Sequence, residues 1–332
     1  MNDSREEFNR SEVTSRGLDA IAVAGEALAP APCRRYGLIA GWGHYPVLLA
    51  QAMRDAGHEV VCLGVLNHAD PALEKICNEF RWMGLGRFAR ACRFFRRHGV
   101  TEATMAGKIH KRLLFAPGFI WRQVPDLYTI RLFLPHFISR QKDCRDDSLL
   151  LTVVDAFARK GITLLPGTDF APELLVKRSQ ITQRGPTAAQ WKDICFGWQL
   201  AREMGRLDVG QSVAVKNQAT LAIEAIEGTD EAIRRAGKLC PQGGFTVVKV
   251  AKPHQDMRFD VPTVGLGTLQ TMVEAGAKVL AIEAKKTILV DANAVIEYAN
   301  KAKLIILALS EEDVQQLDLP FKEPMPGVAG VV

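Results

Sequence analysis

Long hydrophobic runs are absent from this sequence of 332 residues. No apolar stretch reaches the roughly 18 residues that a membrane-spanning helix requires, so an integral membrane protein is not expected. The first residues, MNDSREEFNRSEVTSRG, are polar and charged. They lack the basic start and the apolar core of a signal peptide, and we therefore expect a protein of the cytoplasm.

Closely spaced cysteine pairs are also missing. The seven cysteines are scattered along the chain, and no two of them form a CxxC motif. This spacing argues against a disulfide framework and against a zinc site, and it is typical of a reducing compartment. Hydrophobic residues make up 48% and charged residues 24% of the chain, as in an ordinary soluble globular protein.

Acidic residues are scarce between residues 81 and 145. This segment carries 14 Lys or Arg but only three acids, a net charge of +11, whereas the whole chain has +5. A local basic region favours an anionic partner, such as phosphate groups, a lipid surface or nucleic acid. Residues 87–99 form an amphipathic pattern with arginines opposite an apolar face. This pattern suits either an ordinary surface helix or one that contacts an anionic surface.

The hydrophobic pattern predicts two α/β domains. Strand-like and helix-like segments alternate from residue 36 to about 166, with strands at 37–40, 60–65, 103–106 and 162–165 and helices at 46–56, 85–97 and 147–160. Such alternation predicts a parallel sheet in a Rossmann-like domain over residues 35–166. A mixed α/β catalytic domain is expected over 167–310, with strands at 212–216, 220–226, 245–250, 278–282, 287–291 and 304–309. Residues 1–34 are expected to be a disordered extension and 311–332 a loosely packed tail.

A glycine turn follows the first predicted strand. Gly41 and Gly43 could let the backbone approach a ligand and cradle an anion, or they could simply make a tight turn. Pro46 suits the first turn of the next helix, but it stands where a dinucleotide-binding fingerprint has a third small residue. No acid is well placed for the ribose. An NAD-dependent oxidoreductase is therefore a disfavoured alternative.

Basic residues follow the third predicted strand, in MAGKIHKRLLF. Lys108 should lie at the carboxyl edge of the sheet, where α/β proteins bind ligands. Together with Lys111 and Arg112 it could bind phosphate oxygens, although a solvated basic loop would look the same. His110 could be a general acid or base or a structural histidine.

Aromatic residues gather farther along. Residues 113–140 hold six of the 24 aromatic side chains, interleaved with basic residues. The segment suits an acyl-chain groove, a membrane-facing surface, or a core or dimer interface. It lacks a nucleic-acid recognition motif, so nucleic acid is not an expected partner.

Two polar stretches could carry chemistry in the second domain. In AIEAIEGTDEAIRRAG, Asp230 suits a helix N-cap and Glu231 the first turn, but Glu227 and Asp230 could also hold Mg²⁺. In VVKVAKPHQDMRFD, the side chains Lys249, Lys252, Gln255, Asp256, Arg258 and Asp260 are packed close together after a strand. The lysines are typical phosphate ligands, and the Asp256 and Arg258 side chains could simply pair with each other.

These stretches closely resemble a known family. The segments GRLDVGQSVAVKNQATLAIEAIEGTDEAIRRAG, KVAKPHQDMRFDVPTVGLGTL and AGAKVLAIEAKKTILVD are similar to bacterial UDP-2,3-diacylglucosamine pyrophosphatases of the LpxI type. So are GLIAGWGHYPVLLAQAMRDAG, MAGKIHKRLLF and RDDSLLLTVVDAFARKGI. The resemblance covers residues 36–309 in order, without a large gap.

The resemblance implies a function. Such enzymes hydrolyse UDP-2,3-diacylglucosamine to UMP and 2,3-diacylglucosamine 1-phosphate during lipid A synthesis. They depend on Mg²⁺ and work as dimers beside the inner membrane, on the cytoplasmic side. The family's EGTD aspartate, its essential acid, is Asp230 here, and the family's Gly-Gly-Gly-x-x-Pro loop carries Trp42 in this chain.

The expected catalytic and metal-binding residues are accordingly Asp230 and Glu227. Substrate binding is expected of Gly41, Gly43, Lys108, Lys249, Lys252, Gln255, Asp256 and Arg258. A non-catalytic protein that binds a nucleotide sugar or a lipid is the other alternative.

Overall fold

A computed structural model describes residues 33–84, 86–108, 126–137, 146–253 and 255–316. Outside these residues lie residues 1–32 of the predicted extension, His110, the predicted phosphate ligands Lys111 and Arg112, and most of the aromatic segment 113–140. Among the described residues, no helix is both long enough and apolar enough to cross a membrane.

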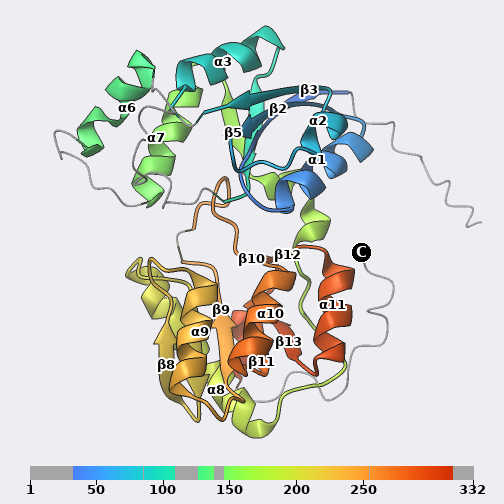
Figure 1. The fold of residues 1–332 in the computed structure, drawn as a ribbon, viewed down its shortest axis with the longest axis vertical. Coiled ribbons are helices and arrows are strands. Elements are labelled where there is room, and N and C mark those ends of the chain that lie inside the picture. Colours follow the sequence, from blue (N-terminus) through green and yellow to red (C-terminus); the bar gives the residue numbers. More distant parts are fainter. Residues whose placement is uncertain (1–32, 85, 109–125, 138–145, 254, 317–332) are drawn as a thin grey trace, which may run out of the picture. The chain divides into compact units, whose positions relative to one another are not determined.

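The N-terminal sheet has five parallel strands, which confirms the predicted fold class. These are β1 (Arg35–Ala40), β2 (Glu59–Val65), β3 (Glu79–Met83), β4 (Glu102–Ala106) and β5 (Thr163–Leu165). Their order is β3-β2-β1-β4-β5, a doubly wound arrangement (Figure 1). The sequence pattern missed β3 because its residues are partly exposed and mostly polar or aromatic, without a clean apolar run.

Helices cover both faces of this sheet. The helices are α1 (Tyr45–Asp55), α2 (Leu73–Ile76), α3 (Phe88–Arg97), α6 (Leu127–Phe137) and α7 (Asp146–Ala158). Tyr45, Leu49 and Met53 recur at every fourth position of α1 and are buried against one face, together with α2. Phe95 of α3 and Phe157 of α7 pack in the core on the other face.

The C-terminal sheet is mixed. It contains β6 (Ser179–Gln180), β7 (Ser212–Lys216), β8 (Ala219–Ile223), β9 (Thr246–Lys249), β11 (Val279–Glu283) and β13 (Ile305–Leu309), in the order β6-β13-β11-β9-β7-β8. Strands β9, β11 and β13 are parallel. Because β7 is antiparallel to both β9 and β8, the last residue of β8 lies at the same edge as the last residue of β9. This edge collects the polar residues described below.

Helices again cover both faces of the C-terminal sheet. Trp198 of α8 (Ala188–Arg206) is buried in one core. The other core holds Ile233, Leu269 and Val295. These three residues belong to α9 (Thr229–Leu239), α10 (Leu266–Ala275) and α11 (Ala292–Lys301), which line up in Figure 1. A separate parallel pair, β10 (Thr263–Val264) and β12 (Ile288–Leu289), completes the strands described.

Two sequence expectations need correction. The strand predicted over 220–226 ends at Ile223, so Glu224 opens the loop before α9. The predicted loose tail instead begins with a packed helix, α12 (Glu311–Gln315). Its Ser310 and Asp313 form a capping box, and Arg178 Nε donates to the buried Asp313 carboxylate at 2.8 Å.

Candidate functional site

The loop after β8 delivers an acidic side chain to the start of α9. Gly228 is the N-cap, with a φ of 85° that favours glycine, so Asp230 lies inside the first turn and the N-cap assignment for Asp230 was wrong. A carboxylate in the first turn is stabilised by the positive end of the helix dipole. Asp230 Oδ1 also accepts a hydrogen bond from Thr268 Oγ1 of α10 at 3.0 Å. The Asp230 side chain is therefore held between two helices.

Glu227, the predicted partner of Asp230, is paired elsewhere. Its carboxylate accepts from Arg235 Nη2 at 2.6 Å, on the exposed surface of α9. A hydrogen bond from its own backbone N–H and the pairing with Arg235 lower the pKa of Glu227. No hydrogen bond joins Glu227 to Asp230 in the described structure, and their joint metal role stays a prediction.

Glu224 is the acid that sequence reasoning missed. It follows the last residue of β8 and is only 8% exposed. Glu224 Oε1 accepts from Thr229 Oγ1 at 2.9 Å, while the buried Oε2 has no hydrogen-bond partner within the described part of the chain. An acid at the carboxyl end of a strand was the available signal, but the overlong strand prediction concealed it.

Lys249 ends β9 and is buried, with 4% of its surface exposed. Its Nζ donates to Thr229 Oγ1 at 3.2 Å and to the backbone oxygen of Thr263 at 3.1 Å. Burial lowers the pKa of Lys249 and the positive charge of Lys108 lowers it further, against the opposing effects of Glu224, Asp230 and Asp260. The charges of Asp230 and Lys108 therefore both act on the buried Lys249 ammonium.

The glycine turn lies beside Lys108 through main-chain contacts. Trp42 N donates to Lys108 O and Lys108 N donates to Trp42 O, both at 2.8 Å. A Cβ added at Gly41 would lie 2.8 Å from Lys108 O, and one at Gly107 would lie 2.8 Å from Trp42 O. Glycine is thus required at Gly41 by the protein's own backbone, and at Gly43 a φ of 108° requires it.

The next residue of the turn contacts the second half of the chain. His44 Nδ1 lies 2.9 Å from Asp291 Oδ2, just before α11. The turn that begins α1 is therefore tied to the C-terminal part of the chain through a side-chain contact.

The polar loop after β9 is largely paired with itself and with nearby residues. Lys252 Nζ donates to Asp208 Oδ1 at 2.5 Å. Arg258 Nε donates to Asp256 Oδ1 at 2.9 Å, and this bond lowers the pKa of Asp256. Gln255 Oε1 accepts from Lys252 N at 2.7 Å, which leaves its buried Nε2 without a partner among the described residues.

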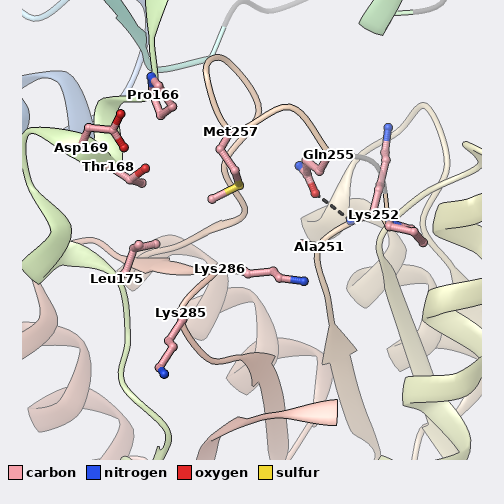
Figure 2. Close-up of a pocket in the computed structure, with 11 residues that line it drawn as sticks. Pro166, Thr168, Asp169, Leu175, Ala251, Lys252, Gln255, Met257, Lys285 and Lys286 are labelled. Carbon is pink, nitrogen blue, oxygen red and sulfur yellow. Dashed lines mark hydrogen bonds between the residues drawn. The ribbon is translucent and has the colours of Figure 1, made fainter.

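A cavity of about 430 Å³ lies next to this loop. Figure 2 shows Met257 and Lys286 extending into it and the Asp169 carboxylate facing it. It is lined by Pro166, Thr168, Asp169, Leu175, Ala251, Lys252, Pro253, Gln255, Met257, Lys285 and Lys286. Several of these residues follow the carboxyl ends of β5, β9 and β11, where α/β proteins place their ligands.

The donor set at Asp230 fits one class of metal. Within the described residues, no three or more His, Cys, Asp or Glu side chains are grouped to enclose an ion. Mg²⁺, however, is commonly bound by one or two carboxylates together with substrate phosphates and water. Asp230 Oδ2 has no hydrogen bond in the described structure, so this hard oxygen is available for such a shared ion.

Comparisons with known proteins match both halves of the chain. Residues 35–174 match the model of the LpxI N-terminal domain, and residues 177–307 match that of the LpxI C-terminal domain. A protein of Caulobacter vibrioides named UDP-2,3-diacylglucosamine pyrophosphatase LpxI is 30% identical over 287 residues, 84% of this chain and 99% of that protein. The chain belongs to the LpxI family. The resemblance inferred from the sequence motifs is thereby confirmed, and the two LpxI matches meet just after the short 3₁₀ turn Pro172–Leu174.

Proposed function

We propose that this chain hydrolyses the pyrophosphate bond of UDP-2,3-diacylglucosamine in a Mg²⁺-dependent reaction. The products would be UMP and 2,3-diacylglucosamine 1-phosphate, for lipid A synthesis. The observation that carries the proposal is the placement of Asp230 in the first turn of α9, electrostatically coupled to the buried Lys249. The name of the Caulobacter relative supplies the substrate.

The acidic and basic residues of the site are proposed to have different roles. Asp230 would hold Mg²⁺ and orient the attacking water, because its Oδ2 atom accepts no hydrogen bond in the described structure. Lys249, with Lys108 near it, would bind phosphate oxygens and stabilise the charge that develops on them. The chemistry expected of a bound Mg²⁺ is neutralisation of the phosphoryl group.

The cavity beside Lys252 would accommodate a less charged part of the substrate. Two of its three lysines are already paired, Lys252 with Asp208 and Lys286 with Glu283. A volume of about 430 Å³ suits one portion of a large lipid nucleotide rather than the whole molecule.

Release of UMP from UDP-2,3-diacylglucosamine tests the proposed reaction directly. We expect UMP to form with Mg²⁺ and its formation to stop when EDTA is added, because the Asp230 carboxylate is itself negative and needs a bound cation to act on an anionic phosphoryl group. A parallel reaction with UDP-N-acetylglucosamine, which lacks the two acyl chains, controls for general nucleotide hydrolysis. Binding of the lipid nucleotide without UMP release would instead support a non-catalytic binding protein.

We further propose that the enzyme works as a dimer in the cytoplasm, on the anionic surface of the inner membrane. The feature that supports contact with the anionic membrane is α3, whose Ala91, Cys92, Phe94 and Phe95 are buried while its arginines point outward. The exposed set is Arg90, Arg93, Arg96 and Arg97, and no carboxylate pairs with these four in the described residues. Unpaired surface arginines attract anionic headgroups.

Reversing charge on α3 should weaken binding to vesicles. The double variant Arg93→Glu/Arg96→Glu is expected to cosediment less with phosphatidylglycerol-containing vesicles at low salt, with an effect that fades as salt is raised. The matched control, Lys238→Glu/Lys301→Glu, removes the same charge from exposed positions of other helices. Equal binding by both double variants would assign α3 to an ordinary surface.

A further inference from the structure

A buried polar network lies beside Asp230. It links the last residue of β9, the first residue of α9 and the residue that follows β8. Lys249 Nζ donates to Thr229 Oγ1 at 3.2 Å, and Thr229 Oγ1 donates to Glu224 Oε1 at 2.9 Å. Lys249 lies 20 positions after Thr229 in the sequence, and the residues meet because β8 and β9 end at the same edge of the sheet.

The strand register explains this meeting. Ser212 of β7 is paired with Lys249 of β9, and its backbone oxygen accepts from Glu224 N at 2.9 Å. Glu224 and Lys249 therefore flank one residue of the strand between them, and Thr229 bridges them from the start of α9. Both charged side chains are more than nine-tenths buried.

Lys249 and Glu224 can each form one more hydrogen bond than the described structure gives them. A lysine ammonium has three N–H donors, and Lys249 uses two of them, on Thr229 Oγ1 and on Thr263 O. The Thr229 hydroxyl donates its one proton to Glu224 and accepts from Lys249, and Ser212 Oγ lies 3.4 Å from the same oxygen. One N–H of Lys249 and the Oε2 atom of Glu224 remain unsatisfied in the described structure.

A purely structural role does not account well for this arrangement. Two buried opposite charges are costly to desolvate, and well-packed apolar residues often serve as well or better. Buried polar groups that keep an unused donor are more typical of sites that receive a ligand. Here the unused donor lies in the electrostatic environment of Asp230 and Lys108.

We infer that Glu224 is a positioning residue that acts through Thr229 to hold the Lys249 ammonium, leaving one N–H for a substrate phosphate oxygen. This inference rests on the proposed function and adds residues to it. Glu224 does not touch the substrate in this arrangement. Its carboxylate fixes the Thr229 hydroxyl, and the hydroxyl fixes the direction of the ammonium.

Four proteins test the coupling: the wild type, Glu224→Gln, Lys249→Met and the double variant. We expect Glu224→Gln to lower kcat about 10-fold with little change in KM, as for the loss of an outer partner of a functional group. The double variant should be no slower than Lys249→Met, because Glu224 acts only through Lys249. Multiplication of the two losses in the double variant would overturn the inference.

The hydroxyl bridge is tested by a conservative pair of variants. Thr229→Val removes the bridge at constant shape and should lose kcat like Glu224→Gln, whereas Thr229→Ser restores the hydroxyl and should recover most of the activity. Glu231→Gln is the control, since this exposed acid of the same helix turn pairs with Arg234. Wild-type kcat in Thr229→Val would overturn the inference.

Thermal unfolding separates this inference from the proposed function. Lys249→Met leaves Glu224 buried without a countercharge, so its melting temperature should fall, and the added Glu224→Gln change should recover part of the loss. If the wild type releases no UMP, the proposed function fails. The recovery of melting temperature in the double variant then tests by itself whether Glu224 and Lys249 are coupled. Additive melting-temperature changes would overturn it.

Discussion

Asp230→Ala should lower kcat for UMP release by at least about 10³-fold while substrate binding survives. The reason is that Asp230 has an available carboxylate oxygen in the first turn of α9, whereas the Glu224 carboxylate is buried and bonded to Thr229, and the Glu231 carboxylate pairs with Arg234. Stability should change little, because the side chain gives up one hydrogen bond, to Thr268, worth about 1 kcal/mol. Steady-state kinetics and equilibrium binding of the lipid nucleotide measure both effects.

The adjacent acid provides the control for Asp230. Glu231→Ala removes the same charge from the same helix turn but leaves Asp230 and Thr268 in place. We expect near wild-type turnover in Glu231→Ala. Equal losses in the two variants would indicate that the helix start, rather than the Asp230 carboxylate, matters for turnover.

Lys249→Met should lower kcat by about 10²-fold, the usual cost of removing one donor to developing charge. Methionine fills the space of the lysine stem, so the loss would come from the ammonium. Stability should fall as well, by about 3–5 kcal/mol, since Glu224 would remain buried without its countercharge. Kinetics at a temperature well below the melting point separates the two effects.

An exposed lysine of α9 controls for charge alone. Lys238→Met removes a positive charge from the last turn of the same helix, where no site residue is contacted. Unchanged kcat in this variant with a large loss in Lys249→Met would attribute the effect to the buried position. A Lys249→Met enzyme that keeps wild-type kcat would remove Lys249 from the site.

Much of the fold could be predicted because its strands are apolar runs bounded by glycine, proline or charged residues. Four of the five N-terminal strands follow this pattern, and β3 escapes it because an edge strand is exposed on one side. The helix at the start of the C-terminal tail was not predicted from the sequence, for a different reason. Its anchor is Arg178, 135 positions away from Asp313, and no local pattern reveals such a partner.

The site was predictable only in part. Lys249 and Asp230 stand out because they fall at a strand end and at a helix start, which sequence patterns can locate. Glu224 did not, because its importance depends on the pairing of β7 with both β8 and β9. Local pairing could be anticipated for Arg258 and Asp256, but the partner of Lys252, Asp208, lies 44 positions away.

The main-chain bridge between Trp42 and Lys108 bears on how this turn can diverge between relatives. Both hydrogen bonds use backbone atoms, and the Trp42 side chain is half exposed. The main-chain bridge itself therefore sets no requirement on the side chain at position 42, whereas any side chain at Gly41 or Gly107 would collide with the opposing backbone. A side chain as large as tryptophan is thus accommodated at position 42 without displacing the backbone that places Lys108.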